Sequence, residues 1–121
     1  MKALIVIAHG SRREESNNEI VEMVTRISMQ LEAGYELVQH AFLEVCEPSL
    51  HTAVESVVKK GAKEIFVYPF FLNSGNHVQR DIPGMIKELN TTHSSCDIHM
   101  LTHFGKQEDI ARMITRHVSQ E

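Results

Sequence analysis

The sequence predicts an α/β fold: a four-stranded parallel sheet flanked by helices. Residues 3–8 form a continuous apolar run of strand length, which is typical of a strand buried on both faces of a parallel sheet. Four such strand segments alternate with four helical segments, at about 30 residues for each pair, the size of a βα repeat. Right-handed crossovers then place helices on both faces of the sheet.

The first half of the chain supplies two strand–helix pairs. Between residues 14 and 32, apolar side chains recur at spacings of three and four, which predicts a helix with one buried stripe that ends at Gly34. Residues 36–43 form the second predicted strand. Residues 47–49 are expected to begin the second helix, because proline is tolerated in a first turn, and Gly61 ends it.

The second half repeats the pattern. Residues 65–72 predict a third strand, residues 73–76 a loop, and residues 78–89 a third helix. Residues 98–101 predict the fourth strand, and Gly105 breaks the chain before a last helix. The apolar side chains of this last helix, which we expect to face the core, are Ile110, Met113, Ile114 and Val118.

Length and composition indicate a single domain over residues 1–121. Apolar residues make up 42% and charged residues 23%, and the net charge is −4, which argues against a nucleic-acid partner because such domains are usually basic. No apolar run approaches the roughly 20 residues of a membrane span, and the apolar start lacks the features of a signal peptide. Cys46 and Cys96 lie far apart, so we expect reduced thiols and a cytoplasmic location.

Three chemically capable side chains follow the first three predicted strands. In open parallel sheets, ligands bind outside the carboxyl ends of the strands, where the strand order reverses. If the strand order is 2-1-3-4, that point lies between the first and third strands. His9 then follows the first strand, Glu44 the second, and His77 the loop after the third. We therefore expect these three side chains to meet at one edge of the sheet.

Two imidazoles suit a borderline divalent metal such as cobalt, iron, nickel or zinc. A site with only two or three protein ligands stays open to a further ligand, as metal transfer requires. Arg12, Arg13 and Lys106 can pair with carboxylates of a ligand, arginine being the better geometric match. Further candidate substrate-binding residues in the same loops are Ser11, Asn73, Ser74, Gly75 and Asn76.

Structural interpretations of these residues remain open. A histidine at a strand end is often only a hydrogen-bonded structural residue, Glu44 can cap the helix that follows it, and Arg12 and Arg13 can be solvated charges at a helix start. His103, at the end of the fourth strand, is a further candidate ligand. Cys46 is expected to be buried. The remaining histidines, expected at the surface, are His40, His51, His93, His99 and His117.

Several motifs resemble the small CbiX/SirB family of sirohydrochlorin chelatases over essentially the whole chain. They are Ala8–Arg12, Phe42–Glu44 followed by Glu47–Leu50, Val67–Leu72 followed by Gly75–Val78, and Asp81–Pro83. The resemblance implies a chelatase-like fold, similar to half of a flavodoxin-like molecule. It also implies a homodimer, because longer members carry two such domains with one site between them.

The family resemblance further implies ATP-independent insertion of Co²⁺ or Fe²⁺ into sirohydrochlorin, on the route to cobalamin or siroheme. The family's metal ligands fall on His9 and His77, and its acidic partner on Glu44. Removal of the two pyrrole protons needs a base, which is either Glu44 or whichever histidine is not holding the metal. No cofactor is implied besides the substrate metal. Nickel is disfavoured because the chain lacks a histidine-rich insertion. Residues 103–105 depart from the Pro-Leu-Gly-like step common in the family.

Two rival functions use the same residues. A phosphotransfer protein would carry a phosphohistidine at His9, but histidine phosphatases have an arginine where this chain has Ala8, and this interpretation leaves His77 unexplained. A non-catalytic metal carrier would use both histidines. The sequence does not separate cobalt from iron.

Overall fold

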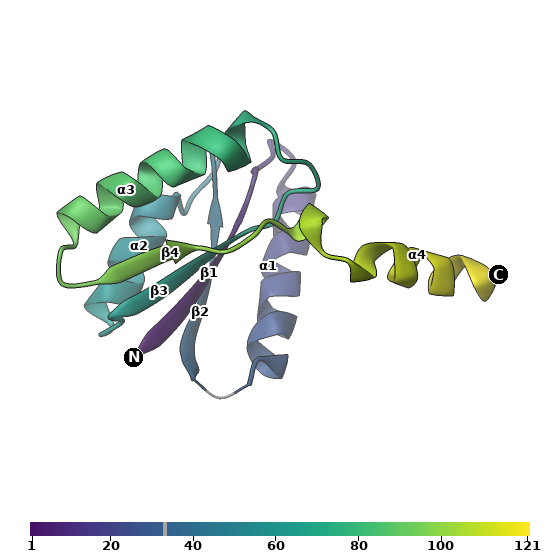
Figure 1. The fold of residues 1–121 in the computed structure, drawn as a ribbon, viewed down its shortest axis with the longest axis horizontal. Coiled ribbons are helices and arrows are strands. Elements are labelled where there is room, and N and C mark those ends of the chain that lie inside the picture. Colours follow the sequence, from purple (N-terminus) through teal and green to yellow (C-terminus); the bar gives the residue numbers. More distant parts are fainter. Residues whose placement is uncertain (33) are drawn as a thin grey trace.

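The computed structural model describes residues 1–32 and 34–121 and contains one parallel sheet with helices on both faces (Figure 1). The sheet has the order β2-β1-β3-β4, so the predicted fold class and strand order are confirmed. The strands are β1 Lys2–Ala8, β2 Tyr35–Phe42, β3 Glu64–Pro69 and β4 Asp97–Met100. The helices are α1 Glu14–Gln30, α2 Leu50–Lys59, η1 His77–Asp81, α3 Ile82–Thr92, η2 Phe104–Lys106 and α4 Asp109–Ser119.

One face of the sheet packs against α2 and α3 and holds most of the core. β1 sends Ala3, Ile5 and Ile7 to this face, and all three are fully buried. The alternate residues Leu4 and Val6 point to the opposite face, which α1 covers. The continuous apolar run of β1 is therefore explained by burial on both sides.

The boundaries differ from the sequence prediction where the chain enters a helix. α2 begins after Pro48, because Ser49 is the N-cap and its hydroxyl accepts a hydrogen bond from the Thr52 amide. The third helical segment begins earlier than expected, with the π-helical turn η1, and α3 continues to Thr92. β3 ends at Pro69, three residues before the predicted end.

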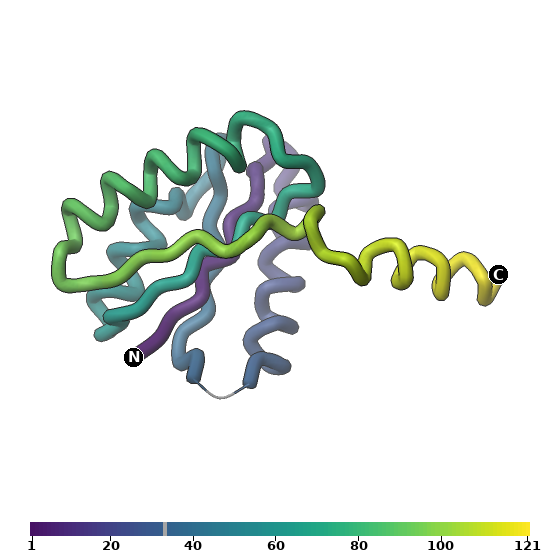
Figure 2. Tube along the Cα trace, in the orientation of Figure 1, coloured from purple at the N-terminus to yellow at the C-terminus, as the bar shows by residue number. Residues whose placement is uncertain are grey.

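The expected burial of the last helix is wrong. α4 extends away from the sheet and the other helices, as the Cα trace in Figure 2 shows. Met113, Ile114 and Val118 are 51%, 58% and 63% exposed, and α4 has no buried residue. The reason is positional: α4 follows η2 after only two residues, and it points outward from the rim of the sheet, with no sheet surface beneath it.

Other expectations concern the cysteines, the histidines and the membrane. Both cysteines are free thiols; Cys96 is buried, whereas Cys46, expected to be buried, is only partly so. His40 is half-buried on β2 and not a surface residue, and the loss of hydration lowers its pKa below 6.5. Within residues 1–32 and 34–121, no helix has the length and apolar character to cross a bilayer.

Candidate metal centre at the carboxyl edge of the sheet

The structure brings His9 and His77 together at the carboxyl edge of the sheet. His9 directly follows β1, and His77 is the first residue of η1, beyond the loop after the neighbouring strand β3. Their ring centroids lie 5.1 Å apart, with the rings nearly perpendicular at 84°. Phe71 contacts both imidazoles, with centroid separations of 6.3 and 6.4 Å, and supplies an apolar wall beside them.

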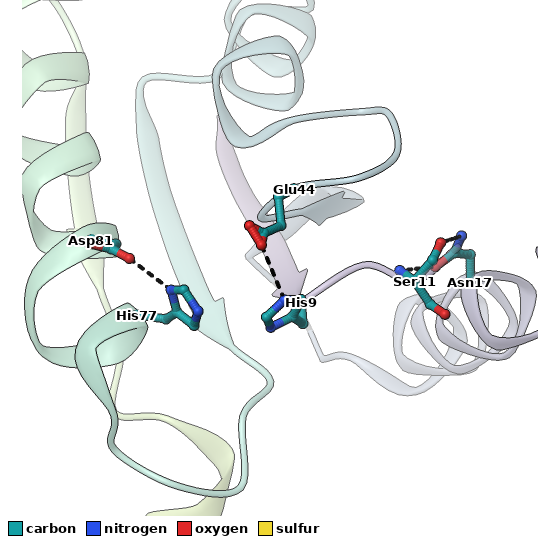
Figure 3. A network of polar contacts seen from close by, with 6 residues as sticks. All are labelled: His9, Ser11, Asn17, Glu44, His77 and Asp81. Carbon is teal, nitrogen blue, oxygen red and sulfur yellow. Dashed lines mark hydrogen bonds and ion pairs between the residues drawn. The ribbon is translucent and has the colours of Figure 1, made fainter. Parts of the chain in front are cut away.

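Glu44 joins this pair as the sequence predicted. Its Oε2 lies 3.4 Å from His9 Nε2, and both side chains are about half exposed (Figure 3). Backbone hydrogen bonds from Leu43 to Ala8 and from Glu44 to His9 continue the β1–β2 pairing past the ends of the strands. Position 10, beside these hydrogen bonds, requires a glycine, because a Cβ there would lie 2.1 Å from the Glu44 carbonyl oxygen. The loop that carries Glu44 is therefore fixed against the loop that carries His9.

The residue after Glu44 has an unfavourable backbone conformation. Val45 has a φ of 77°, and the Cys46 amide donates to the Glu44 carbonyl across it at 2.9 Å, which closes a γ-turn. A β-branched residue rarely adopts positive φ, and such strain clusters at functional sites. The turn ends well before α2, whose N-cap is Ser49, so the alternative that Glu44 caps this helix is wrong.

Asp81 orients His77. His77 Nδ1 lies 2.7 Å from Asp81 Oδ2, on the side of the imidazole away from His9 (Figure 3). A carboxylate that accepts from Nδ1–H fixes the tautomer and leaves Nε2 as the lone-pair donor, the arrangement that orients metal-binding histidines. Sequence reasoning did not single out Asp81. Its i, i+4 spacing from His77 within one helical segment was the available signal.

The first substrate-binding candidates belong to the start of α1. The Ser11 hydroxyl accepts a hydrogen bond from the Arg13 amide, and the Ser11 backbone exchanges two hydrogen bonds with the Asn17 side chain, at 2.8 and 3.0 Å. Figure 3 shows this pair to one side of His9. Arg13 donates to Glu15 at 3.1 Å, and Arg12 is exposed. Ser11 thus builds the turn that presents both arginines to solvent at this edge.

The other candidates lie on the loops after β3 and β4. Asn73, Ser74, Gly75 and Asn76 are all exposed. Gly105 ties the two loops together: its amide donates to the Phe71 carbonyl at 3.0 Å, and a Cβ there would lie 1.6 Å from the Leu72 carbonyl oxygen.

A complete metal cage is not present in the single chain. Across residues 1–32 and 34–121, no three His, Cys, Asp or Glu side chains are grouped as a metal-ligand set. His103 therefore does not form a three-residue ligand set with His9 and His77. Beside Glu44, the loop of residues 42–49 encloses an open hollow of about 430 Å³. The edge is therefore an open, two-imidazole surface with room next to it.

A parallel α/β sheet with two adjacent imidazoles at its switch point defines the class of this protein, a small α/β domain with a candidate metal site. Comparison with known families agrees with this geometry. The chain belongs to the CbiX family, whose model matches residues 3–121.

Curated relatives carry chelatase names. A sirohydrochlorin cobaltochelatase from Methanococcus maripaludis is 36% identical over 71% of this chain and 58% of the relative. The chloroplastic sirohydrochlorin ferrochelatase from Arabidopsis thaliana is 42% identical over 68% of this chain and 36% of the relative. The chain therefore spans about half the length of the curated relatives it matches.

Solved structures share the fold across nearly the whole chain. A CbiX protein from Marinobacter aquaeolei VT8 superposes with a TM-score of 0.83 at 28% identity, covering 99% of this chain and 96% of that one. The sirohydrochlorin chelatase SirB from Bacillus subtilis subspecies spizizenii, in complex with cobalt, superposes with a TM-score of 0.88 at 25% identity. That match covers 98% of this chain and 50% of SirB.

Proposed function

We propose that this chain is an ATP-independent chelatase that inserts Co²⁺ or Fe²⁺ into sirohydrochlorin. The observation that carries the proposal is the pair of imidazoles, 5.1 Å apart, at the switch point of the sheet. The names of the relatives support the substrate: cobalt and iron chelatases of sirohydrochlorin match two thirds or more of the chain. The product would serve cobalamin or siroheme synthesis.

The metal is the first substrate, and His9 and His77 bind it. Two imidazole ligands leave coordination positions for water and then for the pyrrole nitrogens, so the ion passes to the macrocycle as its bonds to the histidines lengthen. Asp81 holds His77 in the tautomer that binds metal through Nε2. The Phe71 ring limits the hydration of one side of the pair.

Insertion replaces two N–H bonds of the macrocycle with bonds to the metal and releases two protons. Glu44 is the base that accepts them in turn, because it lies against His9 and is half exposed, so that each proton can pass on to water. Arg12 and Arg13, exposed at the same edge, bind the peripheral carboxylates of sirohydrochlorin. Ser11, Asn73, Ser74, Gly75 and Asn76 supply further hydrogen bonds.

The proposed active form is a homodimer. The chain is half the length of SirB, and the His9 and Glu44 side chains at its histidine edge are about half exposed. Two copies would thus enclose the macrocycle. No cofactor is proposed beyond the substrate metal. We place the reaction in the cytoplasm, where the two free thiols stay reduced.

The test is a spectrophotometric assay of sirohydrochlorin with Co²⁺ and, under anaerobic conditions, Fe²⁺. We expect metal-dependent loss of the free tetrapyrrole spectrum with the wild type and only the uncatalysed rate with His9→Ala and His77→Ala. His51→Ala, which removes an exposed histidine of α2, is the matched control and should retain the wild-type rate. Full activity of either site variant would refute the proposed ligands.

A metal titration without tetrapyrrole completes the test. Tight binding without turnover would favour the metal carrier, and labelling of His9 by a phosphodonor would favour phosphotransfer.

A further inference from the structure

Two large apolar side chains are exposed on the loops that flank the imidazole pair. Val45 is 59% exposed and directly follows Glu44, which contacts His9. Leu72 is 65% exposed and directly follows Phe71, whose ring contacts both imidazoles. Single exposed apolar residues are normal on a protein surface, but two beside one candidate site are a feature of that site.

The strand order places the loops of these two residues on opposite sides of His9. β2 and β3 are the neighbours of β1, which ends just before His9. Val45 is the third residue after β2, and Leu72 is the third residue after β3. Because neighbouring strands are about 4.8 Å apart, the two loops begin at strand ends about 10 Å apart. This span is comparable to the width of a tetrapyrrole ring.

The backbone fixes both side chains in their exposed positions. Gly105 packs on the loop at Leu72, because a Cβ at position 105 would lie 1.6 Å from the Leu72 carbonyl oxygen. At Val45, the Cys46 amide donates to the Glu44 carbonyl at 2.9 Å and closes the turn. An apolar side chain that is held in water by its own backbone is preorganised for an apolar ligand.

Valine is an unfavourable residue at position 45. Its φ of 77° lies in a region that glycine adopts freely and that β-branched residues avoid. The side chain is mostly exposed and adds little to the core, so a role in stability does not explain it. Backbone strain of this kind clusters at ligand sites. The strain therefore indicates a binding role for the valine side chain.

A tetrapyrrole has an apolar surface that the polar groups of the site do not bind. Its conjugated ring is apolar on both faces, and its carboxylates lie at the periphery, where the proposed function assigns Arg12 and Arg13. We propose that Val45 and Leu72 contact the face of the sirohydrochlorin ring on either side of His9 and hold the ring over the metal. The contact removes apolar surface of both partners from water. The inference rests on the proposed function and adds the residues that bind the ring itself.

The experiment titrates sirohydrochlorin into the protein under anaerobic conditions, without metal, and follows the absorbance of the tetrapyrrole. Val45→Thr keeps the β-branched shape and replaces a methyl group with a hydroxyl, and Leu72→Asn likewise keeps the approximate size. Each should weaken binding about 10-fold. Val45→Ile and Leu72→Met keep the apolar contact and should bind nearly as the wild type does. Met29→Thr, which changes an 80% exposed side chain near the end of α1, is the control and should have the wild-type Kd.

Three further measurements separate ring contact from a role in the metal site. The affinity for Co²⁺ without tetrapyrrole should be the same in Val45→Thr, Leu72→Asn and the wild type, because neither side chain is a ligand. The ratio of variant to wild-type Kd for sirohydrochlorin should be the same at low and high salt, because salt screens ionic contacts and not apolar ones. In turnover, the KM for sirohydrochlorin should rise while kcat changes little, as for a contact made equally in the ground and transition states.

Opposite changes in stability and binding give the sharpest test. Val45→Gly removes both the strain and the side chain, so it should unfold at a higher temperature than the wild type and yet bind sirohydrochlorin more weakly. A purely structural role of Val45 would lower both the stability and the affinity of this variant.

Four outcomes would overturn the proposal. They are a wild-type Kd for sirohydrochlorin in Val45→Thr or Leu72→Asn, a loss of Co²⁺ affinity in either variant, a glycine variant at position 45 that binds as the wild type does, and a change in molar mass by light scattering. The last outcome would assign the two side chains to a contact between copies of the chain.

The inference and the proposed function fail separately. If the variants bind sirohydrochlorin as the wild type does while the wild type inserts metal, the ring contact is wrong and the proposed chelatase stands. If the variants lose binding but the wild type inserts no metal, the ring contact stands and the proposed function fails.

Discussion

The two faces of the sheet are buried to different extents. Among the residues that the structure describes, the face under α2 and α3 holds fifteen buried side chains that form one cluster. The face under α1 holds Leu4, Val6 and Val24 as its buried members in the same part of the chain, surrounded by partly exposed ones such as Tyr68 and Phe70. Both faces are lined by apolar side chains, yet only one is complete in the single chain.

The candidate metal site is tied to the more deeply buried face. η1 and α3, which carry His77 and Asp81, are anchored on the complete face by Val78 and Ile82, which are 6% and 0% exposed. A histidine and the carboxylate that orients it are held in place by the core when they lie on a well-packed element. The incomplete face carries an apolar groove of about 390 Å³, which lies between α1 and the sheet.

The largest expected effect compares adjacent residues of β1 that point to opposite faces. Ile5→Ala removes a fully buried side chain from the complete face and should lower the free energy of unfolding by about 4 kcal/mol. Leu4→Ala, at the wall of the groove, should cost about 2 kcal/mol because the incomplete face offers fewer contacts to lose. Urea unfolding at low protein concentration measures both. Equal costs of Ile5→Ala and Leu4→Ala would contradict the difference between the two faces.

A substitution on the complete face should weaken metal binding or turnover. Asp81→Asn should weaken metal binding or turnover about 10- to 100-fold, because the carboxylate that orients His77 is lost. Asp97→Asn, which removes an exposed carboxylate from the opposite end of the sheet, is the control and should have no effect. Metal titration gives the affinity, and ¹⁵N NMR of the imidazole gives the tautomer. An unchanged tautomer in Asp81→Asn would exclude the orienting role.

The strained turn at Val45 should give a smaller effect of opposite sign. Val45→Gly should raise the free energy of unfolding by about 1 kcal/mol, because glycine adopts positive φ freely and the valine side chain is 59% exposed. Val45→Ala keeps the Cβ, so it should raise the free energy of unfolding by much less. Thermal unfolding measures both variants. A destabilised glycine variant would show that the turn stores no strain.

The smallest effect concerns His40, which lies on the same side of β2 as Val38 and thus on the incomplete face. Burial lowers the pKa of His40 in the folded chain below the ordinary value of 6.5. At a pH between the folded and the unfolded pKa, the unfolded chain therefore binds more protons than the folded one. Stability should therefore fall as the pH drops below about 6.5 and level off below the folded pKa.

The His40→Gln variant should flatten this part of the pH profile, while His51→Gln, at an exposed site, should follow the wild type. Denaturant unfolding at several pH values makes the comparison. An identical slope in both variants would show that His40 titrates alike in the folded and unfolded states.

Periodicity was sufficient for the elements and their succession along the chain, because each strand is a short apolar run and each helix has a stripe. The strand order 2-1-3-4 was an assumption, which the structure confirms. Periodicity was insufficient for boundaries such as the start of η1 at His77, since π-helical turns leave no periodic signal. It also missed Asp81 as the partner of His77, although their spacing within one helical segment was available. The convergence of His9, Glu44 and His77 followed from the parallel topology together with the assumed strand order.

The sequence by itself determined the fold class, because hydrophobic patterning and the handedness of crossovers restrict parallel sheets to few topologies. The loops that meet at the carboxyl edge followed only with the strand order 2-1-3-4 assumed, and the structure supplies that order. Only the tertiary structure decided that α4 leaves the core. An amphipathic stripe indicates that a helix packs on an apolar surface. It does not indicate whether that surface belongs to the same chain. Here the connection at Gln107 and the packing of Phe104 set the direction of the helix.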